Sequence, residues 1–518
     1  MNYHLILVTA RSVVLELLED GYFYTNGYDI YINGKKVLTG EKMVQTVYGL
    51  KPDTAYTIWL EREDEISEKI EFCTKSEFVT LNVREFGAKG DGISDDTGSI
   101  QAAIMSCPEN SRVYLPEGIY KFTNLFLKSN MVLELDENSV LSAFTDKSRI
   151  PVLPGRIESY EENSEYLLAS WEGNPLDSYA SLITGINIEN VLICGQGTMD
   201  GCADFDNWWD GEKRKTDPAR PKMFFLNKCR NVTIQGITVM NSPAWNIHPY
   251  FSKDLRFIDL SIKSPSKSHN TDGLDPESCN NVEIIGVYFS VGDDCIAVKS
   301  GKIYMGKKYK TPSADISISH CYMEKGHGAV TVGSEIGAGV KGIEVKNCIF
   351  YQTDRGLRIK TRRGRGEDSV LQDIVFENIQ MDNVKTPFVV NSFYYCDPDG
   401  KTDYVSCKEP LPVDEHTPGI KNLKFINIDC KDCHVAGGYF YGLPEKKIDS
   451  IEMENIHISY AVNAIEGTAA MMLDCDKTSK TGMFVRNVKK LTMKKVVIEG
   501  NRGETIDVDR VDKMEIYN

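Results

Sequence analysis

The chain has 518 residues, of which 41% are hydrophobic and 26% charged, so one elongated repeat domain and a smaller module fit its length. Its formal net charge of -16 argues against a nucleic-acid partner, because phosphate binding requires a basic surface. No apolar run reaches the roughly 18 residues of a membrane span, so we expect no membrane anchor.

The first 76 residues contain short alternating apolar runs, and Asn33-Gly34 between two of them suits a hairpin turn. Residues 50–58, which include Tyr56, resemble the part of fibronectin type III domains where a tyrosine corner precedes a late strand. We therefore predict a fibronectin type III-like β-sandwich over residues 1–76.

The start of the chain and its cysteines predict a cellular compartment. The apolar run from Leu5 to Val8 lacks the basic segment, the long apolar segment and the cleavage site of a signal peptide. The 14 cysteines are scattered, without the spacing of a small disulfide framework. We expect reduced thiols and a cytoplasmic protein.

Residues 86–97 are rich in glycine and end in acidic and hydroxyl residues that suit the start of a helix over residues 98–105. Such a helix would seal one end of a solenoid. Asp91, Asp95 and Asp96 do not follow the order of an EF-hand loop, so we assign them to turns and caps and predict no metal.

From Val191 onward, a polar or Asn-rich turn followed by a short alternating strand returns again and again. This recurrence predicts an all-β chain in which a right-handed parallel β-helix spans residues 77–518. A β-propeller is the rival fold, but its blades repeat at longer intervals than the shortest ones here. The recurring strings begin at Asn231, Asp254, Asn281, Asp315, Gly342, Asp373, Asn422, Ser450 and Lys490.

Four unusual strings fall in consecutive predicted coils and in a similar sector of each coil. Stacked coils lie about 4.8 Å apart, so their side chains should form one patch. Clustered carboxyl groups suit glycoside hydrolysis, and nearby cations would attract an acidic polymer to an acidic protein. The strings are Asn270-Thr271-Asp272-Gly273, Gly292-Asp293-Asp294, Gly326-His327-Gly328 and Arg358-Ile359-Lys360.

These strings, in this order, resemble the pattern of glycoside hydrolase family 28, the polygalacturonases, and the likeness runs from about residue 80 to the C-terminus. The resemblance implies hydrolysis of α-1,4 bonds in polygalacturonate with inversion and without a cofactor. It implies that Asp293 is the general acid, that Asp272 and Asp294 activate the water, and that His327 supports the acid. The implied substrate-binding residues are Asn270, Arg358, Lys360 and, from a looser match, Tyr394.

Two stretches, about 148–181 with Trp171-Glu172-Gly173 and about 396–417, look like insertions. Exo-acting relatives carry inserted loops that close one end of the cleft, so the resemblance favours release of terminal galacturonate from pectic polysaccharide or oligogalacturonides. Endo action, rhamnogalacturonan hydrolysis, a calcium-dependent pectate lyase and a non-catalytic β-solenoid binding protein are the alternatives. The haem-like string Cys430-Lys431-Asp432-Cys433-His434 is rejected, because a lone CxxC lacks the second pair that zinc needs and haem attachment requires export.

Overall fold

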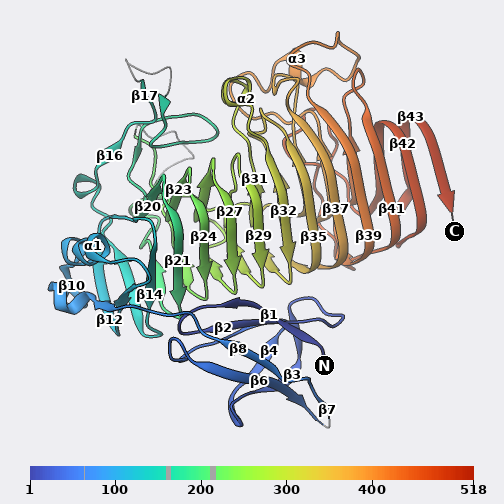
Figure 1. Ribbon diagram of the computed structural model, residues 1–518. Coiled ribbons are helices and arrows are strands. Elements are labelled where there is room, and N and C mark those ends of the chain that lie inside the picture. Colours follow the sequence, from blue (N-terminus) through green and yellow to red (C-terminus); the bar gives the residue numbers. More distant parts are fainter. Residues whose placement is uncertain (64, 159–164, 211–217, 518) are drawn as a thin grey trace.

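The computed structural model describes residues 1–63, 65–158, 165–210 and 218–517. Figure 1 shows a small group of strands at the N-terminus lying beside a long stack of parallel coils, which ends at the C-terminus. The predicted all-β fold and the parallel β-helix are confirmed. Within the described residues, no helix has the length and apolar character needed to cross a bilayer.

The N-terminal strands form two antiparallel sheets, in the orders β1-β2-β5 and β4-β3-β6-β7, with β8 on β6. The Asn33-Gly34 turn joins β3 to β4 with positive φ at both residues (49° and 84°), as a tight hairpin requires. The Tyr56 hydroxyl accepts a hydrogen bond from the Lys51 amide at 2.9 Å. The fibronectin type III likeness and a boundary at residue 76 stay predictions. The strands are β1 (Tyr3–Val8), β2 (Val13–Leu17), β3 (Tyr24–Ile32), β4 (Lys35–Lys42), β5 (Val44–Val47), β6 (Ala55–Arg62), β7 (Glu65–Ile66) and β8 (Ile70–Cys73).

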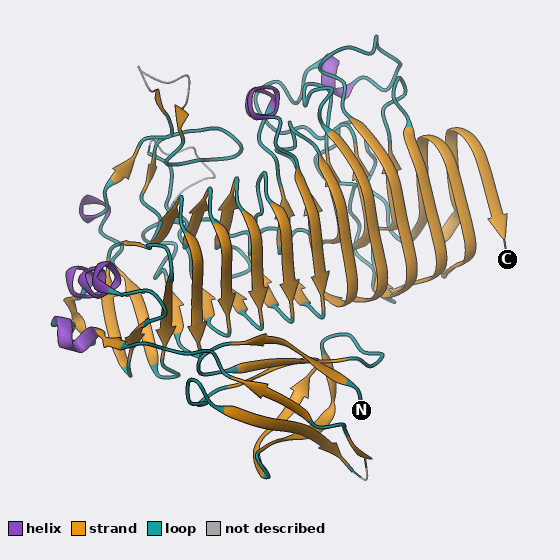
Figure 2. Ribbon diagram, in the orientation of Figure 1, coloured by secondary structure: helices purple, strands orange, loops and turns teal. Residues whose placement is uncertain are grey.

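Each early coil of the helix contributes strands to three rows, all paired in parallel with the next coil. The orange strands in Figure 2 show how these rows line up. The first row holds β9 (Thr80–Asn82), β11 (Arg112–Leu115), β14 (Met131–Leu135), β21 (Glu189–Gly195), β24 (Arg230–Gln235), β27 (Lys253–Ile258), β29 (Asn280–Ile285) and β32 (Ser313–Ser319). The second holds β10 (Asp91–Asp95), β12 (Gly118–Phe122), β15 (Ser139–Ala143), β22 (Thr198–Asp200), β25 (Thr238–Met240), β28 (Ser261–Lys263), β30 (Tyr288–Val291) and β33 (Tyr322–Lys325).

From β35 onward the first two rows merge into long strands, whereas the third row continues separately as far as β40. The long strands are β35 (Val340–Tyr351), β37 (Val370–Asp382), β39 (Gly419–Cys433), β41 (Ile448–Tyr460), β42 (Thr481–Glu499) and β43 (Arg502–Tyr517). The third row consists of β13 (Leu125–Phe126), β20 (Ile183–Ile186), β23 (Phe224–Asn227), β26 (Ile247–Tyr250), β31 (Ile296–Val298), β34 (Val330–Val332), β36 (Arg355–Lys360), β38 (Thr386–Asn391) and β40 (Ala436–Tyr441).

The recurring residue at the start of the coil has a left-handed backbone from Asn231 to Asn422, but not at Ser450 or Lys490. Asn231, Asp254 and Asn281 have φ of 50°, 57° and 55°, a conformation that Asn, Asp and Gly adopt most readily. Their side chains also bridge coils, as when Asn281 donates to Asp254 at 2.8 Å. One residue on, Val232, Leu255, Val282, Ile316, Ile343, Ile374, Leu423, Ile451 and Leu491 stack in register inside the helix.

The ends and insertions of the helix carry its remaining elements. Helix α1 (Thr97–Ser106) follows η1 (Val83–Phe86) and buries Ile100, Ala103 and Ile104 against the first coils, where we expected a sealing helix. The first insertion contains η2 (Lys147–Arg149), β16 (Val152–Leu153), β17 (Ile157–Glu158), β18 (Glu165–Tyr166) and β19 (Ser178–Tyr179). Residues 159–164 of that insertion lie outside the described residues. Helix α2 (Ile303–Tyr309) follows β31, and α3 (Asp403–Ser406) lies in the second insertion.

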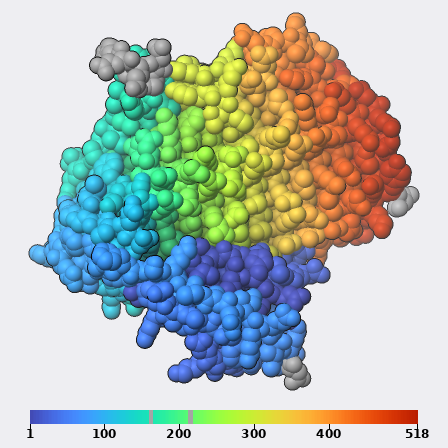
Figure 3. Space-filling model, viewed as in Figure 1, coloured from blue at the N-terminus to red at the C-terminus, as the bar shows by residue number. Residues whose placement is uncertain are grey.

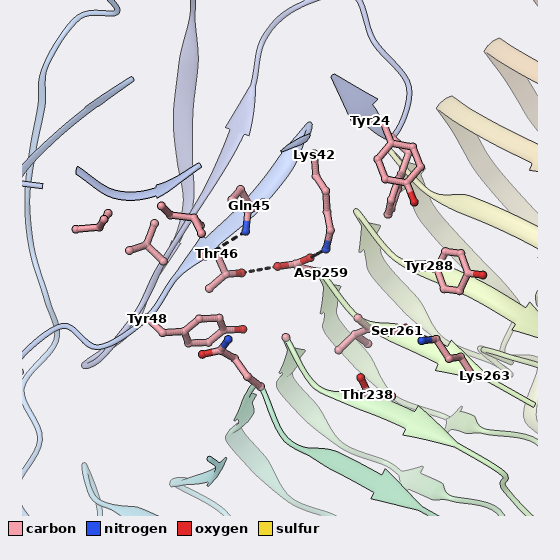
Figure 4. Close-up of a pocket in the computed structure, with 17 residues that line it drawn as sticks. Tyr24, Lys42, Gln45, Thr46, Tyr48, Thr238, Asp259, Ser261, Lys263 and Tyr288 are labelled. Carbon is pink, nitrogen blue, oxygen red and sulfur yellow. Dashed lines mark hydrogen bonds and ion pairs between the residues drawn. The ribbon is translucent and has the colours of Figure 1, made fainter. Parts of the chain in front are cut away.

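The N-terminal sheets pack on one side of the helix, as the blue surface in Figure 3 shows. Val14 and Val44 contact Ile258 and Ile285 of neighbouring coils. The Asp259 carboxylate accepts hydrogen bonds from Lys42 Nζ and Thr46 Oγ1, both at 2.8 Å (Figure 4). Beside these contacts lies a cavity of about 710 Å³ lined by both parts of the chain.

Candidate active site

The third row brings the predicted site residues together. Leu274 bridges Ile247 of β26 on one side and Ile296 of β31 on the other, and β31 pairs with β34 and β34 with β36. Asp272 and Asp294 each stand two residues before a paired position of this row. Neighbouring coils therefore present them side by side, as their phase in the sequence predicted.

Asp272, Asp293 and Asp294 form a compact cluster in which one carboxylate oxygen from each lies within 4.8 Å of the other two. All are buried, and Asp293 is the most accessible at 9% exposure. The Asp293 carboxylate accepts a hydrogen bond from the Asp294 amide at 3.0 Å. Three carboxyl groups this close cannot all be ionised without cations nearby.

Arg358 and Lys360 supply such cations to Asp294. Arg358 Nη1 donates to one Asp294 oxygen at 2.9 Å and Lys360 Nζ to the other at 2.7 Å. Although burial alone raises the pKa of Asp294, the charges of Lys360 and Arg358 hold it well below its usual range. The sequence predicted both cations but not this carboxylate partner.

Asp272 lies in the opposite electrostatic situation. Burial, and after it the charge of Asp293, raises the pKa of Asp272 well above its usual range, while Lys299 opposes this shift. Its Oδ1 is buried without a hydrogen-bond partner, and its Oδ2 lies 3.9 Å from Lys299 Nζ. The cluster thus combines one firmly ionised carboxylate, Asp294, with one whose ionised form is disfavoured by burial and by Asp293 and favoured by Lys299.

His327 reaches this cluster through the backbone, since its amide donates to the Asp293 carbonyl at 3.1 Å. Its Nδ1 lies 2.9 Å from Asp354 Oδ2, which orients the ring. The residues on either side of His327 are glycines because a larger side chain would clash there. A Cβ on Gly328 would lie 2.9 Å from Asp294 Oδ1, and one on Gly326 would lie 2.6 Å from the Asp293 carbonyl.

The other two predicted binding residues lie at the edges of the cluster. Asn270 has φ of 54°, and its Oδ1 accepts a hydrogen bond from Arg220 Nη2 at 2.7 Å. The Tyr394 ring lies 5.9 Å from the Arg358 guanidinium and 5.7 Å from the Lys360 ammonium. All eight predicted site residues therefore belong to one region of the molecule.

The three clustered aspartates could in principle hold a metal ion through their oxygens. Both oxygens of Asp294, however, already accept hydrogen bonds from Arg358 and Lys360. The positive charges of Arg358 and Lys360 would repel a divalent cation there, so the site suits a guanidinium and an ammonium better than a metal ion.

Sequence reasoning missed a second layer of buried charge beneath the cluster. Lys299 lies within 4.0 Å of Asp272, Asp275 and Glu335. Next to it, fully buried His248 Nε2 lies 2.9 Å from Glu277 Oε2. The available signal was a charged residue within an apolar run, as in Cys295-Ile296-Ala297-Val298-Lys299.

Comparison with known proteins agrees with this geometry. The profile of glycosyl hydrolases family 28 matches residues 161–471, and a rhamnogalacturonase A/epimerase, pectate lyase-like profile matches residues 80–136. A probable polygalacturonase of Vitis vinifera is 29% identical over 414 residues, covering 78% of this chain and 79% of that protein. An endo-polygalacturonase of Pectobacterium carotovorum subsp. carotovorum is 30% identical over 316 residues, covering 58% and 73%. Relatives named as exo-acting also occur.

A solved family 28 exopolygalacturonase from Yersinia enterocolitica shares the fold, with a TM-score of 0.73. The likeness covers 99% of this chain and 98% of that one, at 20% identity, and at this identity it shows the fold alone. The family profile, in contrast, matches more than half of the chain and spans every residue of the aspartate cluster. The chain therefore belongs to glycosyl hydrolases family 28.

Proposed function

We propose that this family 28 hydrolase is an exo-acting polygalacturonase that releases terminal galacturonate with inversion. The main support is the aspartate cluster, in which Asp294 is held ionised by Arg358 and Lys360 beside two further carboxyl groups. Inverting glycoside hydrolysis needs one protonated acid and a base that activates water. The names of the relatives point to galacturonan as the polymer.

In this proposal Asp293 protonates the leaving oxygen, and Asp272 and Asp294 take the proton of the attacking water. Asp293 suits the acid because it is the most exposed of the three, and His327 adjoins it through the backbone. Arg358 and Lys360 keep Asp294 ionised and present their remaining N–H groups to a galacturonate carboxylate. Tyr394 lies against both cations, and Asn270 takes part at the edge of the site.

The position of the first insertion supports exo action. This segment leaves the helix before β20 and contacts residues of later coils. Trp171 stacks on Trp245 with centroids 6.0 Å apart and planes 9° from parallel. The Gly173 carbonyl accepts a hydrogen bond from the Lys302 amide at 3.1 Å, just after β31. A segment held across the coils that carry the aspartates would limit how far a polymer can extend past the site.

The second insertion and helix α2 extend this barrier. Glu165 of the first insertion pairs with Lys308 of α2 at 2.5 Å, and Lys307 of α2 pairs with Glu415 of the second insertion at 2.6 Å. Asp397, also in the second insertion, binds Lys302 at 2.7 Å. In Figure 1 these segments rise together on one side of the helix. These ion pairs thus connect the two insertions and α2 into one continuous group of loops beside the third row.

Sizing of the products over time tests the proposal. With polygalacturonate as substrate, we expect galacturonate monomer from the first minutes, at the same rate with or without chelator. A ladder of oligomers at early times would overturn exo action but leave the hydrolase. An unsaturated, ultraviolet-absorbing product that chelator abolishes would overturn hydrolysis itself.

We also propose that the protein works in a reducing compartment such as the cytoplasm. All 14 cysteines are unpaired, and most are buried. Unpaired thiols in this number are typical of reducing compartments. Fractionation of cells that produce the full-length protein tests this, and recovery from the medium or the periplasm would contradict it.

A further inference from the structure

Lys299 is a buried lysine directly after β31, and no role has been given to it so far. Its backbone bridges Glu277 in the preceding coil, with its amide donating to the Pro276 carbonyl at 2.9 Å. The residue is 3% exposed. Its backbone position is therefore fixed by the coil, and its side chain is enclosed.

The Lys299 ammonium lies among three carboxylates. Its Nζ is 3.2 Å from Glu335 Oε2 and 3.9 Å from both Asp272 Oδ2 and Asp275 Oδ2. It also lies 4.5 Å from the centre of the Trp245 ring, the indole on which Trp171 of the first insertion stacks. One cation thus serves three acids, and an aromatic face limits where it can move.

Asp272 and Asp275 depend on this cation. Asp272 Oδ1 and both Asp275 oxygens are buried without a hydrogen-bond partner. In the described parts of the chain, no other basic nitrogen lies within 4.0 Å of either carboxyl group. A buried carboxylate without a counter-charge is strongly disfavoured, so the charge of Lys299 favours the ionised forms of Asp272 and Asp275.

We propose that Lys299 is a positioning residue whose buried charge favours the ionised form of Asp272 and orients this carboxylate for activation of the attacking water. This inference rests on the proposed function, in which Asp272 shares that task with Asp294. Asp294 has two cations of its own, so Lys299 completes the pair of bases from the other side.

Glu335 competes with Asp272 for the same ammonium. It is the nearest of the three carboxylates and accepts a hydrogen bond from Lys299 Nζ. Removal of its charge should free Lys299 to act more strongly on Asp272, whereas removal of Lys299 should leave Asp272 uncompensated. The charged groups that act on Lys299 or Asp272 are Asp275, Asp293, Asp294, Glu277, Glu335, Arg220, Lys360 and His248.

The test measures kcat/KM for polygalacturonate as a function of pH in Lys299→Met and Glu335→Gln. The acidic limb reports the ionisation of the base. In Lys299→Met we expect this limb to move to higher pH by about one unit or more, because a cation within a few ångströms is lost. In Glu335→Gln we expect it to move to lower pH. Glu335→Gln should add nothing in the double variant, because Glu335 acts through Lys299.

Two further variants separate positioning from folding. Lys299→Arg keeps the positive charge, so the acidic limb should lie close to its position in the unsubstituted protein. Lys222→Met is the matched control, because Lys222 is also buried and lies 5.3 Å from the same Trp245 ring, while its Nζ donates to the Ser170 carbonyl. That control should lose stability without moving the limb.

The inference is overturned if the limb stays in place in both Lys299→Met and Glu335→Gln, or moves in the same direction in both. Where Lys299→Met does not fold, Glu335→Gln and Lys299→Arg decide the matter. Asp293→Asn separates this inference from the proposed function. If Asp293→Asn retains turnover, the proposed roles fail; if it loses turnover while the limb is insensitive to Lys299, only this inference fails.

Discussion

The central coils, from β29 to β36, and the C-terminal coils, from β37 to β43, share one register but differ in their third row. Inside the helix both stack apolar residues, such as Val282 on Ile316 and Ile374 on Leu423. In the third row, Arg358 of β36 is followed at the same register by Val389 and then Tyr439. The stack therefore fixes backbone positions equally in both regions. The chemistry of the site, and not the fold, explains why charged residues are buried in the third row of the central coils.

On the long strands of the C-terminal coils, charged side chains such as Asp429 face the outside of the stack. Asp429 of β39 pairs with His457 at 3.0 Å and with Lys431 at 3.0 Å, and all three side chains are at least 38% exposed. Water solvates such pairs, so they contribute little to stability. In the central coils Asp294 is fully buried and relies on Arg358 and Lys360. Equivalent substitutions in the two regions should therefore differ sharply.

The largest difference is expected for catalysis. Asp293→Asn should lower kcat by at least about 10³-fold, because the group that protonates the leaving oxygen is lost, while substrate binding is largely retained. Asp429→Asn on the outer face of the C-terminal coils should leave kcat unchanged. Release of reducing sugar and calorimetric binding of oligogalacturonides check both. Normal turnover in Asp293→Asn would contradict the role of this residue.

The next effect concerns stability. Lys360→Met leaves Asp294 with one cation fewer in a buried site, and we expect a loss of about 3 to 5 kcal/mol in the free energy of unfolding. Lys431→Met is the control on the exterior and should cause no measurable loss. Urea denaturation followed by circular dichroism compares the two. Similar midpoints for both variants would show that the Asp294 cluster adds little to the fold.

The last effect concerns pH, and it is the smallest when expressed per pH unit. Burial raises the pKa of Glu277 to about 8, so between roughly pH 4.3 and 8 the folded protein binds a proton that the unfolded chain has released. Stability should therefore fall as pH rises through this window, by up to about 1.4 kcal/mol per unit from this group. Glu277→Gln should flatten that slope. Thermal melting at several pH values measures it, and an equally steep slope in Glu277→Gln would refute the assignment.

The pKa of Asp294 is shifted in the opposite direction from that of Glu277, so its effect on stability also has the opposite dependence on pH. Its pKa is held below the usual range, so its contribution to stability is complete above about pH 4 and is lost only as the pH falls further. In the pH range where Glu277 titrates, Asp294 contributes a constant amount.

The sequence predicted the repeat well because one local rule produces it. A residue with positive φ starts most coils, so Asn, Asp or Gly recurs at Asn231, Asp254 and Gly342. The helix over residues 98–105 was likewise found as Thr97–Ser106, although its N-cap residue Asp96 makes no side-chain cap hydrogen bond and binds the amides of Lys89 and Gly90 instead. The packing of the N-terminal sheets was not predictable, because Lys42 and Asp259 are far apart in sequence.

The sequence predicted which site residues lie close together, but not which of them pair with one another. Phase along the coils placed Asp272, Asp294 and Arg358 together, and the stacked third row confirms that they are neighbours. Which cation binds which carboxylate depends on side-chain reach, which periodicity does not encode. Lys299 was missed for that reason, since it directly follows the apolar strand β31 and resembles an ordinary residue at a strand end.

The side-chain bridges between coil corners, such as Asn281 to Asp254, have one more consequence. They tie the strands of each turn directly to those of the next, so the rise per turn is independent of loop length. Distances between catalytic groups on neighbouring turns then change only in whole steps of the strand spacing, about 4.8 Å. Loops between the strands can lengthen and shorten during evolution, altering which ends of a polymer enter, while the spacing that the chemistry requires is inherited unchanged.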